Sequence, residues 1–549
     1  MVGPSETANT IARIIAATAA VAMVAAAVTA VSEWRPQIPR SEASSSSFVR
    51  LLAESDDLGP STPERPLSLL VLLRNDANQP PNDEFGAEVA TLESYVHAAG
   101  LTTSWQAGNR WLTLTGKTVS MERVFNVDVH EYRSHDGVRF AASMRDPVVP
   151  PALQSLIAGT GHMSTYVIAR GPSVPAGGLR AIDMLAAYDM KPLRDLELDG
   201  SGETVVFFEG FPIGGYKQAD LNVFTEREHL PPISVTQRTT LPGTPPSTAE
   251  AEMDLEIVHA IAPGAKLAVY TTPDPVSADD LLALQDRMVS ENPGAIVVIE
   301  WGSFEDGVTR AQADAMVSVY HHADQLGETV LAPSFDDGAF SGLNSNWGAV
   351  PSERYLSQWL PTTMPGVTSV GGTRISVRRD GGWYNETVWE DPAGTEGSGG
   401  GLARYIPMPS WQRAPGTMNR FSNGMREVPD VSADADPASG ASIYISEFGG
   451  WTTGGGTSQS GPILAGAVAL VNQYLKRQGL KPAGFLNPSL YALAAGNPVY
   501  PPFHDITIGT NLYYPATQGY DMATGLGTPD VWNLARDLES LGRRGSSID

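Results

Sequence analysis

The chain has 549 residues, of which 42% are hydrophobic and 18% charged, so it can form a sizeable core and is not disordered throughout. Its 36 Lys and Arg face 61 Asp and Glu, and the net charge of −25 disfavours nucleic acid as a partner. Because cysteine is absent, thiol catalysis, disulfides and iron–sulfur clusters are excluded.

The N-terminal segment carries no charge from residue 14 to residue 32 and consists mostly of Ala and Val, with small residues at 28–30. This pattern predicts that residues 1–34 are a signal peptide for export, or an uncleaved membrane anchor. A soluble Ala-rich helix is the alternative. We therefore expect a secreted protein, or one anchored to the cell membrane. Residues 35–65 are rich in Ser and Pro and are predicted to be a linker.

Residues 66–170 have the pattern of a small α/β domain. The predicted strands cover 67–74, 103–115, 127–132 and 138–142, and the predicted helices cover 84–99, 119–125 and 150–159. A Pro/Gly-rich connector is predicted over 171–202, exposed and with one short helix near 182–188.

Residues 203–535 alternate between predicted strands and helices, which favours a doubly wound, mostly parallel sheet covered on both faces. The strands are expected at 204–209, 266–271, 295–301 and 329–333, and the helices at 217–229, 248–261, 278–291 and 310–326. Residues 498–530 are predicted to be rich in loops, and residues 536–549 to be a polar tail.

A Gly-rich turn, residues 454–456, brings Ser458 to the start of an apolar helix over 463–475. Backbone N–H groups at a helix start stabilise a developing oxyanion, so a hydroxyl placed there can be a nucleophile. The alternative is an ordinary Ser/Thr cap on a Gly-rich loop.

None of the nine histidines lies where it would be a convincing base, so carboxylates are the remaining candidates. Glu250 and Asp254 are four residues apart on one helical face, where two close carboxylates share a proton readily. Asp336 follows a strand at its carboxyl end and could donate a proton to an oxyanion. The alternative for Glu250 and Asp254 is that acidic residues in a first helical turn only offset the helix dipole. The alternative for Asp336 is an ordinary Asx turn.

The loop-rich tail places Asp505 and Asp521 among glycine-rich backbone, which suits Ca²⁺ although the spacing is not that of an EF-hand. Two ordinary surface loops would explain the same residues.

Together these segments resemble the sedolisin family of serine-carboxyl peptidases, and most closely its kumamolisin-like members. The motifs that carry the resemblance are Glu250-x-x-x-Asp254, Ala262-Pro263-Gly264-Ala265, Trp301-Gly302, Val370-Gly371-Gly372-Thr373, Ser398-Gly399-Gly400-Gly401, Pro429-Asp430-Val431-Ser432-Ala433, Gly456-Thr457-Ser458-x-Ser460-x-Pro462, Asp505-Ile506 and Thr524-Gly525-Leu526-Gly527. Residues 66–170 resemble the family's activation propeptide.

The resemblance implies a subtilisin-like α/β body in which Ser458 is the nucleophile and Glu250 the general base. It further implies that Asp254 supports Glu250, that Asp336 is the acid of the oxyanion hole, and that an extended network includes Glu209 and Trp301. One Ca²⁺ would be held by the carboxylates and backbone carbonyls of Asp505, Ile506, Thr517, Gly519 and Asp521.

Three positions depart from the family pattern. Asp337 places a second acid after Asp336, in Phe335-Asp336-Asp337-Gly338 where the family usually has Gly-Asp-Ser-Gly. Glu300 stands where the family usually has Ser before its Trp, and Thr517 replaces a typical Gly. These changes affect the expected level of activity and its pH dependence, while every catalytic side chain is present.

The sequence therefore predicts a secreted, self-processing, acid-acting endopeptidase. Its substrates would be proteins or peptides, and its own propeptide would inhibit it until cleavage near 171–200. Two alternatives are open: a tripeptidyl exopeptidase of the same family, and a weakly active surface or binding protein that keeps the fold.

Overall fold

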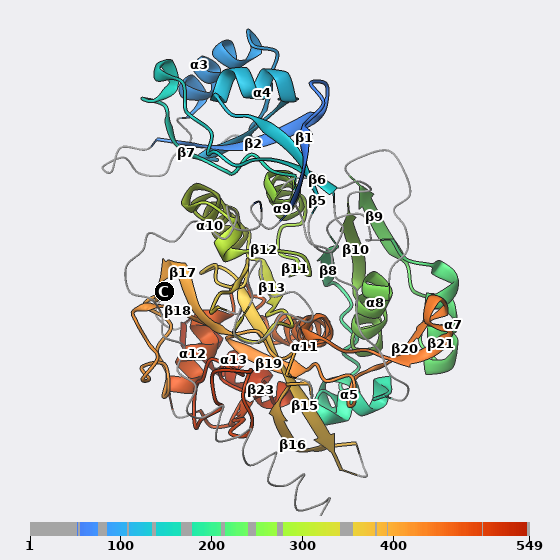
Figure 1. Cartoon of the computed structure of the whole chain (residues 1–549). Coiled ribbons are helices and arrows are strands. Elements are labelled where there is room, and N and C mark those ends of the chain that lie inside the picture. The colour runs from blue at the N-terminus through green and yellow to red at the C-terminus, as the bar shows by residue number, and fades with distance from the viewer. Residues whose placement is uncertain are drawn as a thin grey trace, which may run out of the picture. The chain divides into compact units, whose positions relative to one another are not determined.

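The computed structural model describes residues 52, 55–74, 85–106, 109–133, 139–165, 178–209, 215–239, 249–271, 278–340, 355–378, 381–391, 394–496 and 498–545 (Figure 1). The expected signal or anchor at residues 1–34 lies outside them. None of the helices in these ranges combines the length and apolarity that a membrane crossing requires.

The N-terminal α/β region, residues 55–165, contains two antiparallel sheets, with strand orders β3-β4-β2-β7 and β1-β5-β6. Its elements are β1 (Asp56–Pro60), β2 (Pro66–Leu73), α3 (Gly86–His97), β3 (Thr102–Ser104), β4 (Trp111–Lys117), α4 (Thr118–Phe125), β5 (Val129–Arg133), β6 (Arg139–Ser143), η1 (Pro151–Leu153) and β7 (Ile157–Thr160).

Three sequence predictions for this region are wrong in detail. The end of the expected linker is strand β1, which pairs with β5. The expected strand over 103–115 is two strands, β3 and β4, which pair with each other. The expected helix over 150–159 is a single 3₁₀ turn followed by β7, because Ile157 and its neighbours extend the sheet beside β2.

The central sheet of the C-terminal body has the order β16-β15-β13-β11-β8-β10-β9, and β19 also pairs with β15. Its strand pairs are parallel except the β15–β16 pair, which confirms the mostly parallel sheet. The strands are β8 (Thr204–Phe208), β9 (Val235–Thr239), β10 (Lys266–Thr271), β11 (Ile296–Ile299), β13 (Thr329–Pro333), β15 (Thr368–Val377), β16 (Trp383–Val388) and β19 (Val431–Asp434). Strands β9, β15, β16 and β19 were not predicted.

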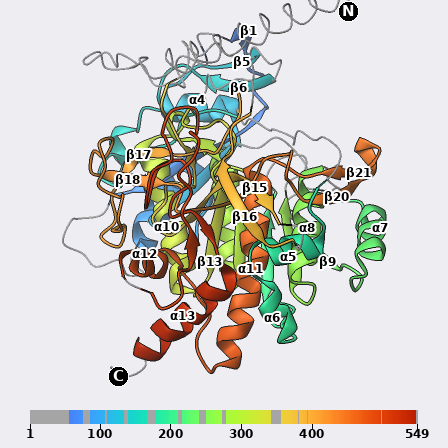
Figure 2. The ribbon, with the colours of Figure 1, turned by 90° about the horizontal axis from the view of Figure 1, so that it is seen from below.

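Helices cover both faces of this sheet, because its strands are apolar on both sides. Val205 and Phe207 of β8 pack with α8 and α11, whereas Val206 and Phe208 pack with α9 and α10. Helices α8 and α11 contact each other on their face (Figure 2). The body's helices are α5 (Ala181–Ala187), α6 (Lys191–Asp195), α7 (Gln218–Glu228), α8 (Ala249–Ile261), α9 (Ala278–Glu291), α10 (Arg310–Gln325), α11 (Thr457–Arg477), α12 (Asn487–Ala495) and α13 (Val531–Gly545).

Shorter strand pairs complete the body outside the central sheet. They are β12 (Ser303–Phe304) with β14 (Trp359–Leu360), β17 (Gly401–Pro407) with β18 (Met425–Val428), β20 (Ser442–Ile445) with β21 (Gly450–Thr453), and β22 (Phe503–His504) with β23 (Thr528–Pro529).

Two boundary predictions are also corrected. The connector predicted as exposed over 171–202 is part of the body from Gly178 onward, because the apolar side chains of α5 and α6 join the core on the α8 and α11 face. The polar tail predicted over 536–549 is helical as far as Gly545. That stretch continues α13, whose apolar residues Leu534, Ala535 and Leu538 recur at helical spacing and are buried.

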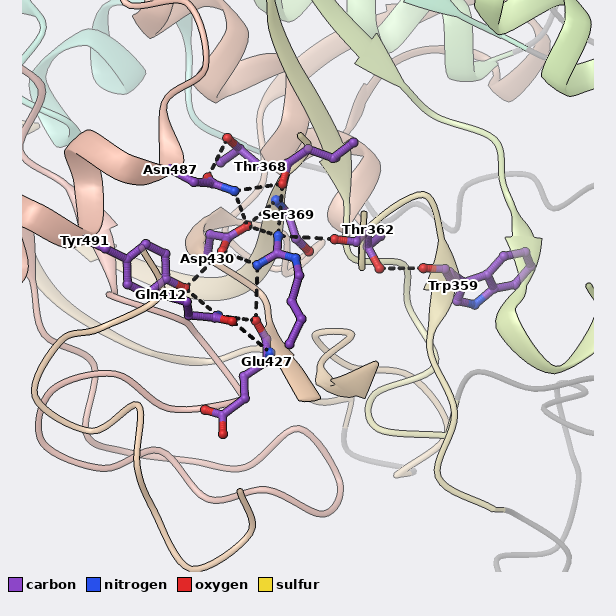
Figure 3. A network of polar contacts seen from close by, with 11 residues as sticks. Trp359, Thr362, Thr368, Ser369, Gln412, Glu427, Asp430, Asn487 and Tyr491 are labelled. Atoms are coloured by element: carbon purple, nitrogen blue, oxygen red, sulfur yellow. Dashed lines mark hydrogen bonds and ion pairs between the residues drawn. The ribbon is translucent and has the colours of Figure 1, made fainter. Parts of the chain in front are cut away.

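A buried ion pair connects strands β15 and β18 to helix α12 (Figure 3). Arg426 and Asp430 are both inaccessible to solvent, and their two hydrogen bonds measure 2.9 and 2.7 Å. Asp430 also accepts hydrogen bonds from the Ser369 N–H at 2.8 Å and the Tyr491 hydroxyl at 2.9 Å. The pair therefore fixes β15, β18 and α12 against one another.

Replacing one partner of this pair should destabilise the fold strongly, because the other charge stays buried. We predict that Arg426→Met lowers the free energy of unfolding by about 3–5 kcal/mol. Urea unfolding in a Ser458→Ala background, which excludes self-digestion, measures the change. The matched control is Asp195→Asn, which removes an exposed ion pair with Lys191 and should cost less than about 0.5 kcal/mol. Equal losses in the two variants would contradict this role for Arg426.

Candidate active site

Ser458 is the second residue of α11 and is half-buried. The helix begins after Gly456, whose φ of 76° is a conformation that favours glycine. The long apolar body of α11 is buried, so the start of the helix is held firmly against the sheet. Ser458 therefore lies in the first turn of the helix, where the N–H groups point towards the N-terminal end.

Helix α8 provides the two predicted carboxyls, and all 13 of its residues are buried. The Ser458 hydroxyl lies near enough to the Glu250 carboxyl to lower its pKa. Burial outweighs this effect and, with the charges of Glu209 and Asp336, raises the pKa of Glu250 to about 8. Asp254 is inaccessible to solvent, and burial together with the charges of neighbouring carboxyls raises its pKa well above the ordinary value.

Adjacent strands bring further residues to the same place, because the carboxyl ends of parallel strands meet at one edge of a sheet. Glu209 follows β8 and receives a hydrogen bond from the indole N–H of Trp301 at 3.4 Å. Glu209 also interacts with Asp254. Glu300 follows β11, and its oxygens lie within 4.8 Å of those of Glu250 and Asp254. Sequence reasoning noted Glu300 only as a departure and did not predict its place among the other carboxyls.

Asp336 reaches this cluster from the end of β13. Its Oδ1 accepts hydrogen bonds from the backbone N–H and the hydroxyl of Thr457, both at 2.8 Å. A Cβ on Gly456 would lie 2.7 Å from the other oxygen, Oδ2. The Asp336 carboxyl therefore fits against the glycine turn directly before the candidate nucleophile.

The turn that carries Asp336 is held by the Gly-rich segment after Ser398. The N–H groups of Gly397 and Gly399 donate to the carbonyls of Asp336 and Phe335, each at 2.8 Å. A Cβ on Gly399 would lie 1.7 Å from the Ser334 carbonyl oxygen, so only glycine fits there. The close approach of the Ser334 backbone therefore explains why the predicted motif has a glycine at position 399.

The additional acid, Asp337, is directed away from the cluster. It is buried, and its Oδ2 accepts a hydrogen bond from the indole N–H of Trp359 at 3.0 Å. Phe335, which has a φ of 67° in place of the usual glycine, stacks on Trp359 with 4.3 Å between ring centroids. The departures at these two positions are therefore accommodated by one buried tryptophan.

None of the histidines in the described ranges takes part in the cluster. His259 lies on α8 and contacts the Pro231 carbonyl at 2.7 Å, and His504 stacks on Trp383. The other acidic pair of α8 is structural: Glu252 and Glu256 accept backbone N–H groups of Lys217 and Tyr444, both at 2.8 Å.

The residues predicted to bind calcium come together in the C-terminal loops. Asp505 accepts the Gly519 N–H at 3.0 Å, and Asp521 accepts the Thr517 N–H at 2.8 Å. Asp521 is buried and Asp505 exposed. Asp521 Oδ1 accepts three further hydrogen bonds, from the N–H groups of Ala523 and Thr524 and from the Thr524 hydroxyl, whereas Asp521 Oδ2 accepts only the Thr517 N–H. Carboxylate oxygens with a remaining lone pair, such as Asp521 Oδ2 and those of Asp505, fit a hard cation. Among the described residues, the group of three acids that could hold a metal is Glu250, Asp254 and Glu300, not these two.

Comparison with known proteins finds relatives in one peptidase family. Residues 85–163 match the family described as "Pro-kumamolisin, activation domain". Kumamolisin of Bacillus sp. is 32% identical over 80% of this chain and 81% of its own length. Sedolisin of Pseudomonas sp. is 27% identical over 86% and 85%, respectively. A solved structure of Pseudomonas sedolisin, a serine-carboxyl proteinase complexed with pseudo-iodotyrostatin, superposes with a TM-score of 0.57 at 26% identity, covering 67% of this chain and all of that one.

Gly456 supplies a test of the site geometry. We predict that Gly456→Ala lowers kcat/KM by about 100-fold or more, because the new methyl group displaces the Asp336 carboxyl. Peptide hydrolysis measures the change. The control is Gly424→Ala, which has a similar φ of 88° with no atom within 4 Å of the added Cβ. It should share the backbone strain and keep its activity. Equal losses would attribute the effect to strain instead.

Proposed function

Because this chain belongs to the sedolisin family of serine-carboxyl peptidases, with an activation propeptide, we propose that it is a secreted, acid-acting endopeptidase working through an acyl-enzyme on Ser458. The observation that carries the proposal is the contact between the Ser458 hydroxyl and a buried carboxyl, Glu250, beside Asp336. A hydroxyl nucleophile with an adjacent base at a helix start is the arrangement that acyl transfer requires.

In the proposed reaction, the Ser458 oxygen attacks the carbonyl carbon of the peptide bond, and its proton passes to Glu250. Asp336 in its protonated form, together with N–H groups at the start of α11, stabilises the oxyanion. Glu250 then gives the proton to the leaving amine, and water hydrolyses the acyl-enzyme by the same route in reverse. Asp254, Glu209 and Trp301 hold Glu250 in place.

The raised pKa of Glu250 works against a base that must be ionised in acid. Part of that rise comes from the charges of Glu209 and Asp336, which disappear once those carboxyls hold protons. The nearby Ser458 hydroxyl continues to favour ionised Glu250. We therefore propose that in acid the cluster loses one proton, from Glu250, while Asp336 keeps the proton that it donates.

The propeptide packs beside the candidate site. Tyr132 and Phe140, on the hairpin formed by β5 and β6, belong to one apolar cluster with Phe304 and Trp359, and Phe335 packs against that cluster. Phe335 precedes Asp336 directly. This contact supports the proposal that the propeptide limits access to the site until it is removed.

A buried polar contact holds the same propeptide on helices α9 and α10. Asp279 accepts hydrogen bonds from the backbone N–H of Leu70 and from the Gln312 side chain. Leu70, Leu72 and Trp111 join the apolar core that contains these two helices. Since Gly178 onward is packed in the body, we propose that cleavage occurs within residues 166–177.

We also propose one Ca²⁺ in the C-terminal loops, bound by Asp505, Asp521 and the carbonyls of Ile506, Thr517 and Gly519. The chain has no disulfide to hold this segment, and an ion that binds only the folded state would stabilise it. When bound, the ion would link the two loops electrostatically; it has no part in the reaction proposed above.

The purified proform provides the direct test of function. Incubated from pH 3 to pH 7, the wild type should lose its residues up to 166–177, fastest well below about pH 6.5, the reference pKa of histidine. Ser458→Ala should fold and remain full length, because removal of the nucleophile abolishes acyl transfer. Mass spectrometry identifies the fragments, and also reports whether residues 1–34 are already absent from the exported protein.

The mutant must be incubated without wild-type enzyme, which would cleave it in trans. Maturation of Ser458→Ala at the wild-type rate would refute the nucleophile, and an optimum at pH 8 would refute acid action. Amino-blocked peptides distinguish the alternative specificity, because a tripeptidyl exopeptidase leaves them intact.

Calcium binding predicts a second, independent result. A chelator should lower the melting temperature of the Ser458→Ala proform, since it removes an ion that binds only the folded chain. Asp521→Ala should remove the chelator's effect; Asp505→Asn should reduce it while disturbing only one backbone hydrogen bond. The control Asp195→Asn should respond like its parent. Equal melting temperatures with calcium and with chelator would refute the site.

A further inference from the structure

Glu300 is the one member of the carboxyl cluster to which the proposed mechanism gives no task. It lies directly after β11, and its backbone N–H donates to the Phe208 carbonyl at 3.2 Å. Its side chain reaches the first turns of α11, where a Cβ on Gly461 would lie 3.3 Å from Oε1. Gly461 is one turn beyond Ser458, so the Glu300 carboxyl lies beside the helix start that carries the nucleophile.

The Glu300 carboxyl is buried without a conventional partner. The residue is 3% exposed, and neither oxygen has a hydrogen-bond partner of ordinary geometry. The Ser458 hydroxyl is nevertheless near enough to lower its pKa. The Ser458 hydroxyl is therefore near both carboxyls, Glu250 and Glu300.

Among the described residues, the charged groups that raise the pKa of Glu300 are acidic. Glu250 from α8, Glu209 after β8 and Asp336 after β13 each raise its pKa, in addition to burial, and Glu300 in turn raises the pKa of Asp254. An isolated buried carboxylate is costly, and a second negative charge nearby increases that cost. Burial and the neighbouring carboxyls raise the pKa of both Glu250 and Glu300, so the two cannot readily be ionised at the same time.

We propose that Glu300 is a positioning residue that keeps its proton in the active enzyme and shares it as a hydrogen bond with the Ser458–Glu250 pair. The proposal rests on the roles given above to Ser458 and Glu250. Glu250 then carries the single negative charge next to the nucleophile, and the neutral Glu300 orients both partners. Ionisation of Glu300 would place a second negative charge beside the developing oxyanion and slow the reaction.

Two substitutions of similar side-chain volume distinguish the loss of the Glu300 hydrogen-bond donor from a change in packing. Glu300→Gln keeps a hydrogen-bond donor and should lower kcat/KM at the optimum by less than about tenfold, whereas Glu300→Leu, with no donor, should lower it by about 100-fold. In Glu300→Gln the alkaline limb of the pH profile of kcat/KM should also move upward by about half a unit or more, because one inhibitory ionisation is absent. Mature enzymes and one soluble peptide substrate are used throughout.

A second measurement needs no activity. It uses the Ser458→Ala proform. If the pKa of the Glu300 carboxyl is higher in the folded chain than in the unfolded chain, the free energy of unfolding falls as pH rises from about 4.5 towards the folded-state pKa. Glu300→Gln removes that loss, so its melting temperature should rise relative to the parent as pH increases from 4 to 7. Glu328→Gln is the matched control. Glu328 is a buried carboxyl at the opposite end of a neighbouring strand, before β13, and burial raises its pKa to about 9. Glu328→Gln should show the stability effect without a change in the kinetic pH profile.

The outcomes are distinct. An unchanged pH profile in Glu300→Gln, or no growing stability difference, overturns the proposal. A loss as large as that of Glu250→Gln also overturns it, because Glu300 would then have to carry the charge. A wild-type enzyme that hydrolyses nothing refutes the proposed function instead, while the stability measurement still tests whether Glu300 keeps its proton.

Discussion

The structure depends on the burial of several carboxyls in one place without a compensating cation. Glu209, Glu250, Asp254 and Glu300 are almost inaccessible to solvent, and among the described residues no Lys, Arg or His shifts their pKa values. Such groups cannot all ionise together. Some of these carboxyls must therefore be protonated, and such a cluster can exchange a proton with the nearby Ser458 hydroxyl.

The parallel sheet brings these groups together. Glu209, Glu300 and Asp336 follow the adjacent strands β8, β11 and β13, while α8 and α11 contribute Glu250 and Ser458 from one face. Close backbone approaches then fix the finer positions. Gly399 allows the turn of Asp336 to pair with the glycine segment, and Gly456 leaves room for the Asp336 carboxyl. The positions of the reacting side chains are thus determined by where the strands end and by glycines that allow close backbone approach.

Much of this arrangement could be predicted from local pattern. Strand and helix alternation located β8, β10, β11 and β13, and the four-residue spacing of Glu250 and Asp254 placed both on one helical face. What local pattern did not contain was long-range burial. The helix α5 and the end of α13 read as polar or exposed, although Leu185 and Leu538 are buried against segments far away in the chain. Edge strand β9 and the side-chain direction of Asp337 likewise depend on partners distant in sequence, Val269 and Trp359 among them.

The central claim is that Ser458, at the start of α11 within a proton-rich cluster of carboxyls, is the nucleophile of the site. A peptide aldehyde labelled with ¹³C at its carbonyl carbon, bound to the mature enzyme in acid and observed by NMR, tests that claim most directly. The account predicts a tetrahedral hemiacetal carbon that is present in the wild type and absent from Ser458→Ala. An aldehyde that stays free or hydrated in the wild type, or a hemiacetal that persists in Ser458→Ala, would contradict it.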